Sequence, residues 1–285
     1  MSNRWILVNN TRNRETAQRD LLTARQIGLD TEYDSFRYFR EKLCLIQIST
    51  EHHTYLFDPL LDIDFSFLGE VSMNPATVKI IHACDNDIRL LNRDYGFRFT
   101  NVFDTYRAAG ILGDTGLSLK AILQDYLGVE LQKTKKIQRS RWDLRPLTDE
   151  QLDYAALDTR YLLDLYSRLK ERLALNNLED AAQEIFDKMA AVRWQEKNFN
   201  PKGFFAVDGY DDLEECQKIR LQKLYHWRFE TARRTNRAPF LILSDKAIVD
   251  LSKEETDSVG SLGDTGILSP ETVQSFGSEI IKTMR

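Results

Sequence analysis

The chain is poor in the residues that would indicate an unusual scaffold. Its three cysteines, Cys44, Cys84 and Cys216, are odd in number and far apart, which argues against a disulfide framework or a cysteine-rich zinc site. Six prolines and thirteen glycines among 285 residues are too few for a linker-dominated chain. No apolar run approaches the roughly 18 residues of a membrane helix, and the first apolar stretch is too short for a signal peptide. We therefore expect a cytoplasmic protein that does not bind a membrane.

Basic residues are outnumbered overall but concentrated in two segments. The 39 lysines and arginines against 44 aspartates and glutamates give a net charge of −5, which alone argues against a nucleic-acid partner. Residues 131–145 nevertheless contain six basic residues and one acid, and residues 216–237 contain seven and one. Local positive charge attracts a polyanion whatever the total. These segments are either phosphate-binding surfaces or solvated helix faces.

The first half of the chain alternates strand and helix patterns. Helical periodicity covers residues 14–24, 85–95 and 118–126, and Gly96 and Gly128 are placed to end the last two helices. The short gaps between the second, third and fourth strands favour an antiparallel meander. The pattern predicts an α/β domain with one mixed sheet flanked by helices. The expected strands are residues 5–8, 26–32, 43–49, 54–57, 78–83 and 102–103.

From Thr148 the pattern is helical, apart from residues 198–212, which have no helical period and are typical of a linker. Thr148 and Gln151 have the spacing of a capping box, and the helix they open is predicted to run to about Leu173. Length allows about two domains. We place an α/β domain at 1–175, a helical extension and linker at 176–212, and an all-α domain at 213–285.

Three acidic clusters carry the candidate chemistry. Asp30 and Glu32 end a predicted strand at i and i+2, so both side chains project from one face. Adjacent carboxylates repel one another unless a cation neutralises them, which favours a hard divalent metal such as Mg²⁺ or Mn²⁺. In the second cluster, Asp85 is placed to cap the following helix and Asp87 lies in its first turn. Both could serve the helix alone.

The third cluster lies on the predicted helix after Thr148. Tyr154 and Asp158 stand at i and i+4, so one helical face presents a phenol and a carboxylate together. The small residues between them, Ala155 and Ala156, allow close packing against another element. A surface hydrogen-bonded pair is the alternative explanation for this cluster.

In type, order and spacing, these clusters resemble the motifs of the DEDD family of 3′→5′ exonucleases, in the tyrosine-bearing branch typified by ribonuclease D. Asp30-Thr31-Glu32 resembles the first motif, and residues 42–47 resemble the strand after it. Residues 82–91 are similar to the second motif, with Asp87 rather than Asp85 as the metal-binding residue. Residues 142–147 and the pair Tyr154 and Asp158 resemble the approach to the third motif and its core.

The resemblance implies a ribonuclease H-like sheet and two divalent metal ions, Mg²⁺ or Mn²⁺. Asp30 would bridge both ions, Glu32 and Asp158 would complete one, and Asp87 would hold the other. Tyr154 would orient the attacking water, since a phenol with a pKa near 10 positions water better than it takes a proton. The products would be nucleoside 5′-monophosphates released from a 3′ end.

Residues 213–285 resemble the HRDC domain, a helical module also present in RecQ-type helicases, which serves either nucleic-acid binding or stability. Lys135, Arg141 and Arg145 are candidate contacts to backbone phosphates. The leading interpretation is an RNA exonuclease that trims single-stranded 3′ ends such as those of tRNA precursors. A DNA exonuclease and a non-catalytic nucleic-acid-binding protein are the alternatives. Since one chain carries every motif, we expect a monomer.

Overall fold

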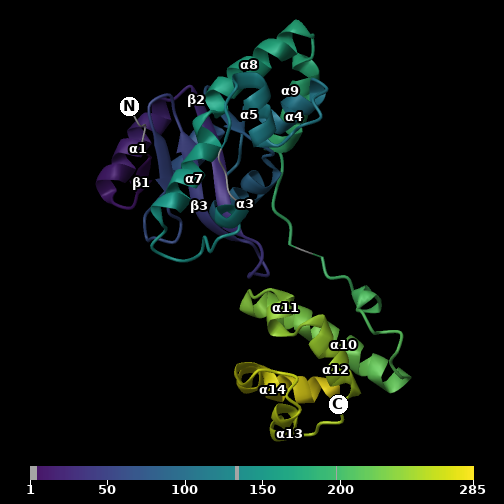
Figure 1. Cartoon of the computed structure of the whole chain (residues 1–285). Coiled ribbons are helices and arrows are strands. Elements are labelled where there is room, and N and C mark those ends of the chain that lie inside the picture. Colours follow the sequence, from purple (N-terminus) through teal and green to yellow (C-terminus); the bar gives the residue numbers. More distant parts are fainter. Residues whose placement is uncertain (1–4, 132–134, 197) are drawn as a thin grey trace. The chain divides into compact units, whose positions relative to one another are not determined.

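The computed structural model describes residues 5–131, 135–196 and 198–285. The chain divides into two compact units (Figure 1). The first, called the sheet unit, comprises the chain up to Asp34 together with Lys42–Gln195. The second, called the helical unit, comprises Glu196–Arg285 and also takes in Ser35–Glu41 from the first half of the chain. Lys133, one of the basic residues in the segment 131–145, lies outside the described residues.

One mixed sheet forms the centre of the sheet unit. Its six strands lie in the order β1-β4-β3-β2-β5-β6. Strands β2, β3 and β4 pair antiparallel as the predicted meander, whereas β1 pairs with β4, β5 with β2, and β6 with β5 in parallel. The prediction of a mixed sheet is confirmed. The strands are β1 (Ile6–Val8), β2 (Gln26–Asp34), β3 (Lys42–Ser49), β4 (Thr54–Phe57), β5 (Val78–Ile81) and β6 (Val102–Asp104).

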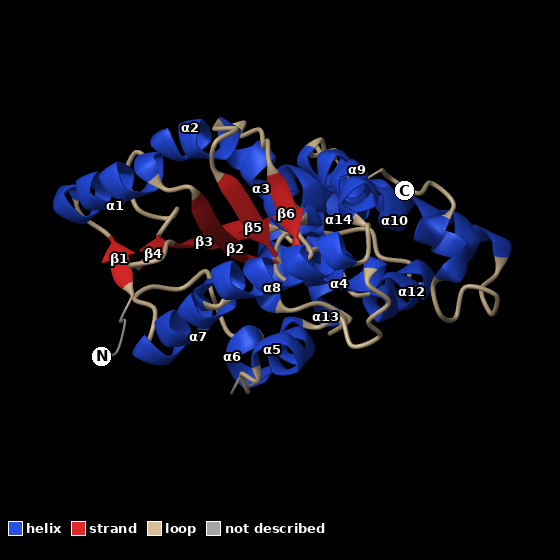
Figure 2. Ribbon diagram, turned by 90° about the horizontal axis from the view of Figure 1, so that it is seen from above, coloured by secondary structure: helices blue, strands red, loops and turns tan. Residues whose placement is uncertain are grey.

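Helices cover both faces of this sheet (Figure 2). Helices α1, α2 and α3 pack on one face around a core that includes Ile27, Leu29 and Leu91. Helices α7 and α8 lie on the other face, where α7 contacts β2, β3 and β4. The helices of this unit are α1 (Thr11–Thr23), α2 (Phe67–Met73), α3 (Asp85–Tyr95), α4 (Thr105–Ile111), α5 (Leu119–Leu127), α6 (Lys135–Gln138), α7 (Asp149–Arg160), α8 (Leu162–Leu175) and α9 (Glu179–Ala190).

Local signals set several helix ends, with one correction. Gly96 and Gly128 adopt the left-handed conformation at the C-caps of α3 and α5, and Thr148 and Gln151 form the predicted capping box. The single helix predicted from Thr148 to about Leu173 is wrong, because the chain breaks at Tyr161 into α7 and α8. At the break the backbone approaches β2 closely. A Cβ on Gly28 would lie 2.9 Å from the carbonyl oxygen of Thr159.

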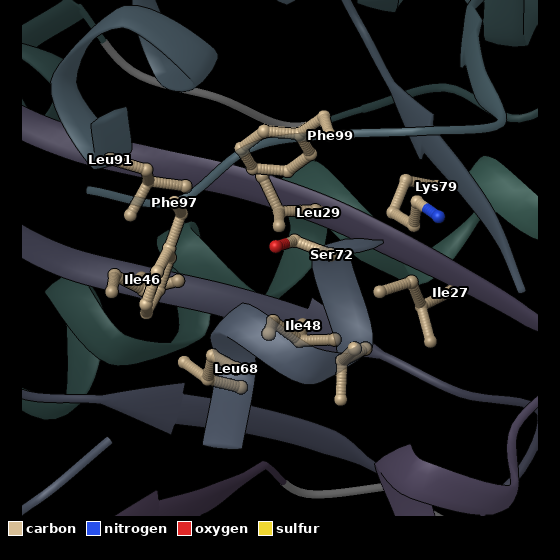
Figure 3. A pocket seen from close by; sticks show the side chains of 11 residues that line it. Ile27, Leu29, Ile46, Ile48, Leu68, Ser72, Lys79, Leu91, Phe97 and Phe99 are labelled. Carbon is tan, nitrogen blue, oxygen red and sulfur yellow. The ribbon is translucent and has the colours of Figure 1, made fainter. Parts of the chain in front are cut away.

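A small cavity lies between the sheet and the layer of α2 and α3 (Figure 3). Its volume of about 10 Å³ is room for about one water molecule. Ile27, Leu29 and Leu68 are among the apolar residues of the wall, and Lys79 of β5 also lines it. The Lys79 ammonium group is buried and donates to the carbonyl oxygens of Asn74 (2.9 Å) and Thr77 (2.8 Å). Because Ile27 and Leu29 alternate with Asp30, the cavity opens on the sheet face away from that carboxylate.

The helical unit has its own core, which includes Leu221, Leu224, Ile248 and Ile280. The segment Ser35–Glu41 joins this core through Phe39, whose ring contacts Phe229 at 5.1 Å. No helix in the described part of the chain is both long and apolar enough to cross a membrane. The elements of the unit are the 3₁₀ helix η1 (Gly203–Ala206), α10 (Glu215–Thr235), α11 (Pro239–Ile242), α12 (Asp245–Lys253), α13 (Val259–Asp264) and α14 (Pro270–Met284).

Candidate active site

Strand β2 places Asp30 and Glu32 on the face covered by α7. Successive strand residues point to opposite faces, and Ile27 and Leu29 are buried in the core beneath α1, α2 and α3. Gly28 abuts Thr159 at the end of α7, so Asp30 and Glu32, at the same parity, share that side of the sheet. The strand geometry therefore brings the two carboxylates to one face of the sheet, as the sequence predicts, and α7 covers that face.

Helix α7 adds Tyr154 to these carboxylates. The Tyr154 side chain is buried and packs beside Trp142, with ring centroids 6.0 Å apart. Burial, followed by the negative charges of Glu32 and Asp30, raises the pKa of Tyr154 above its usual value. The phenol is thus protonated at neutral pH and can donate a hydrogen bond. Asp158 follows one turn later on the same helix face and is half-buried.

Asp87 joins the site from the first turn of α3. Its carboxylate is 5% exposed and accepts a hydrogen bond from the Thr31 hydroxyl at 2.5 Å. Burial, and next the charge of Asp30, raise the pKa of Asp87 well above its usual value, while the Thr31 bond opposes this rise. Asp30 is thus the common electrostatic neighbour of Asp87 and Tyr154. The structure brings these three predicted residues together.

A buried carboxylate holds the turn that leads into α3. Asp104 accepts hydrogen bonds from the backbone N–H groups of Ala83 (3.0 Å) and Cys84 (3.1 Å), and from those of Tyr106 (2.9 Å) and Arg107 (3.3 Å) at the start of α4. Ala83 has a φ of 57°, an unusual conformation for a residue with a side chain. Asp104 therefore fixes the entry to the helix that carries Asp87.

The predicted capping role of Asp85 is wrong. Cys84 occupies the N-cap position of α3, with no side-chain capping bond. Asp85 instead accepts both of its hydrogen bonds from the Arg107 guanidinium, at 3.0 and 2.9 Å. The sequence also gave no indication of the long-range role of Asp104.

The donor set suits a hard divalent cation. Asp30, Glu32, Asp87 and Asp158 offer only carboxylate oxygens, the ligands that Mg²⁺ and Mn²⁺ prefer. The raised pKa of the buried Asp87 beside Asp30 marks a concentration of negative charge that a cation would relieve. Among the described residues, no three His, Cys, Asp or Glu side chains are gathered into a ready-made metal cluster. The structure therefore supports the donor chemistry and gives no coordination geometry.

The three candidate phosphate-binding residues have different surroundings. Lys135 begins α6 and is exposed. Arg141 donates to the Asp143 carboxylate at 2.7 and 2.8 Å, with 44% of its side chain exposed. Arg145 donates to the buried Asp58 carboxylate, at 2.6 Å from Nη2, and to backbone carbonyls, including that of Cys44. Arg145 thus binds within the protein, whereas Lys135 faces solvent.

Most of the basic residues of the segment 216–237 take part in ion pairs inside the helical unit. Arg228 pairs with Asp245 at 2.7 Å, and Arg234 pairs with Glu279 at 2.9 Å. Lys218, Arg220 and Arg233 likewise lie within 4.0 Å of a glutamate. Their positive charge is therefore largely compensated locally, which favours a stabilising role for these five side chains.

This fold is that of a 3′-5′ exonuclease domain. Residues 6–174 match the protein-family model described as 3′-5′ exonuclease, and residues 217–284 match that of the HRDC domain. The chain belongs to the 3′-5′ exonuclease family and carries an HRDC domain after the exonuclease domain. Membership of the DEDD group of these enzymes implies the use of divalent metal.

Curated relatives come from eukaryotes and bacteria. Exosome complex component 10 of Rattus norvegicus is 34% identical over 249 residues, which cover 82% of this chain and 27% of that protein. Ribonuclease D of Haemophilus influenzae is 30% identical over 261 residues, which cover 90% of this chain and 64% of that protein. The chain thus spans about a quarter of the first relative and less than two thirds of the second.

Solved structures share the fold at lower identity. The catalytic core of RRP6 from Trypanosoma brucei aligns over 100% of this chain and 82% of that chain, with a TM-score of 0.87 and 23% identity. Escherichia coli RNase D aligns over 98% of this chain and 74% of that chain, with a TM-score of 0.72 and 24% identity. These alignments cover the sheet unit and the helical unit of the present chain.

Proposed function

We propose that this protein is a metal-dependent 3′→5′ exoribonuclease that releases nucleoside 5′-monophosphates one at a time. The observation that carries the proposal is the convergence of Asp30, Asp87 and Tyr154, in which the charge of Asp30 acts on both other side chains. Three acidic or phenolic groups from β2, α3 and α7 thus meet within a domain of the 3′-5′ exonuclease family.

Four carboxylates are proposed to hold two divalent ions, Mg²⁺ or Mn²⁺. Asp30 would serve both ions, Glu32 and Asp158 would serve one, and Asp87 the other. Such ions, when bound, stabilise the charge that develops on the phosphate oxygens and acidify water. Tyr154 keeps its proton because its pKa is raised, so it orients water by hydrogen bonding and does not act as the base.

We propose RNA as the substrate because of the names that related proteins carry. Curated relatives of this chain are named as exosome components and as ribonuclease D, and the E. coli enzyme is described as an exoribonuclease involved in structured RNA processing. We propose that this chain trims single-stranded 3′ ends of structured RNAs such as tRNA precursors. Lys135 and Arg141 are proposed to contact backbone phosphates, and Lys135 is the stronger candidate because it is exposed.

The direct test compares two polymers of one sequence. RNA and DNA oligonucleotides labelled at the 5′ end are incubated with the protein and Mg²⁺, Mn²⁺ or a chelator. A metal-dependent ladder that shortens from the 3′ end, formed faster on RNA, is the expected result. Faster cleavage of DNA would instead support the DNA exonuclease, and binding without cleavage would support the non-catalytic interpretation.

Matched variants connect the activity to the site. Asp30→Asn and Asp158→Asn are expected to remove cleavage while circular dichroism and unfolding remain those of a folded protein. Asp125→Asn makes the same chemical change at an exposed position on α5 and is expected to keep full activity. Near-normal turnover by Asp30→Asn would refute the proposed site.

A monomeric state and a cytoplasmic location are also proposed. One chain contains every motif residue, which favours a monomer, although several relatives are named as components of the exosome complex. Light scattering on the purified protein measures the first point, and fractionation of cells measures the second. A stable oligomer in solution would contradict the proposed monomer.

A further inference from the structure

Gln47 is a buried polar residue that the proposed reaction does not yet use. It lies in β3, two residues before the end of the strand, and its side chain has no exposed surface. Within the described part of the chain, neither its amide nitrogen nor its amide oxygen has a hydrogen-bond partner. Burying such a group without a partner costs free energy, so the position calls for an explanation.

The sheet register places Asp30 beside Gln47. Gln47 pairs with Asp30 of β2 on one side and with Leu56 of β4 on the other. Residues directly opposite in an antiparallel pair share a face and have Cβ atoms about 4.5–5.5 Å apart. Since Leu56 is apolar, Asp30 is the polar side chain that the register supplies to the Gln47 amide.

The neighbouring polar pair on the same face is fully bonded. Ser49, two residues after Gln47 on β3, makes hydrogen bonds of 2.8 Å with Thr54 and 2.7 Å with Thr159 of α7. The packing beneath α7 can therefore satisfy buried polar side chains, and it does so next to Gln47. Gln47, by contrast, stands opposite the Asp30 carboxylate and has no partner among the described residues.

We propose that Gln47 is a positioning residue for Asp30, whose amide N–H group fixes the orientation of that carboxylate when divalent metal is bound. A neutral amide suits this role because it orients a carboxylate without cancelling the negative charge that attracts the cation. A lysine at this position would compete with the metal. The inference rests on the metal site in the proposed function, and it gives the buried Gln47 amide a role there.

The test is a comparison of stability and metal affinity in Gln47→Met, which keeps the length of the side chain and removes its polar atoms. The metal-free variant is expected to unfold at the same urea concentration as the wild type or at a higher one, because no hydrogen bond is lost. Its affinity for Mn²⁺, measured by titration calorimetry, is expected to fall by about 10- to 100-fold, as for other residues that orient metal ligands.

Two controls separate the positioning role of Gln47 from a general effect on stability. Gln124→Met makes the same change at an exposed position on α5 and is expected to alter neither quantity. Ser49→Ala removes bonded groups and is expected to lower stability. Loss of stability in metal-free Gln47→Met, or wild-type Mn²⁺ affinity, overturns the proposal. A wild-type protein whose Mn²⁺ affinity falls in Gln47→Met, yet which fails to degrade RNA, would refute the proposed function alone.

Discussion

The hydroxyl of Thr31 donates a hydrogen bond of 2.5 Å to the carboxylate of Asp87, and both side chains are about 5% exposed. This bond joins β2 to α3 on the sheet face opposite the one that Asp30 shares with α7. Strand β2 therefore contributes to the site from both faces. Asp30 and Glu32 lie on one side, while Thr31 holds the third carboxylate from the other.

Thr31→Val is expected to lower both stability and turnover. Valine keeps the shape of threonine but cannot donate to the buried Asp87 side chain, and leaving a buried acceptor without its donor costs about 1–3 kcal/mol. Urea unfolding should show a loss of that order, and the single-turnover rate on RNA should fall. Thr31→Ser keeps the hydroxyl and is expected to lose less of both. Equal behaviour of the two variants would count against the bond.

Asp104→Asn is expected to lower the free energy of unfolding by about 3 kcal/mol. The asparagine NH₂ group replaces a carboxylate oxygen that accepts hydrogen bonds in the wild type, so donors would face donors. Cys84 and Arg107 would lose their acceptor at Oδ2. Activity should fall as well because the turn into α3 positions Asp87. Asp125→Asn is the control. A variant as stable as the wild type would show that Asp104 does not hold this turn.

Gly28→Ala is expected to cost about 1–3 kcal/mol of stability through overpacking. Its Cβ would lie 2.9 Å from a backbone oxygen of Thr159 and 3.1 Å from Leu162, so the junction of α7 and α8 must move. Asp158 adjoins this junction, and kcat should therefore fall more than KM rises. Gly110→Ala, where the nearest contact is an ordinary 3.7 Å, is expected to leave stability unchanged or higher.

The buried Lys79 makes stability depend on pH. Burial lowers the pKa of Lys79 to about 8, whereas an unfolded lysine has a pKa near 10.4. Between these values the unfolded chain binds more protons, so this lysine makes the native state more stable as pH rises from about 8 to about 10. As pH rises over this range, the unfolding free energy of the wild type should therefore increase relative to that of Lys79→Met. A constant difference would contradict the buried charge.

Arg145→Met is expected to lower stability, whereas Lys135→Met is expected to weaken RNA binding. Arg145 removal leaves Asp58, which is 4% exposed, without its guanidinium, and breaking such a pair costs about 3–5 kcal/mol. Lys135 is exposed, so its removal should raise KM for RNA by a few-fold without changing the melting temperature. If Arg145→Met instead keeps the stability of the wild type and loses RNA binding, Arg145 is a phosphate contact after all.

Residues that are close in the chain were placed well by sequence reasoning. The two-residue period of a strand put Asp30 and Glu32 on one face, and helical spacing did the same for Tyr154 and Asp158. Both glycine caps and the Thr148 capping box follow from local conformational preferences. These features depend on a few neighbouring residues, so the sequence carries them directly.

Contacts between distant segments could not be predicted in this way. Arg145 and Asp58 are 87 positions apart, and only the fold shows that they pair. The break at Tyr161 likewise depends on the approach of α7 and α8 to Gly28 of β2. The pairing of Gln47 with Asp30 follows from the strand register, which the antiparallel meander allowed but did not fix.

The helical unit includes the loop between β2 and β3. Phe36 and Phe39 of this loop contact Phe240 and Phe229, and the Arg37 carbonyl accepts a hydrogen bond from the Ala238 backbone at 2.9 Å. A truncation near Gln195 would therefore leave apolar side chains without their partners. To exchange HRDC domains between related enzymes, the loop between β2 and β3 of the recipient must therefore be replaced together with its C-terminal segment.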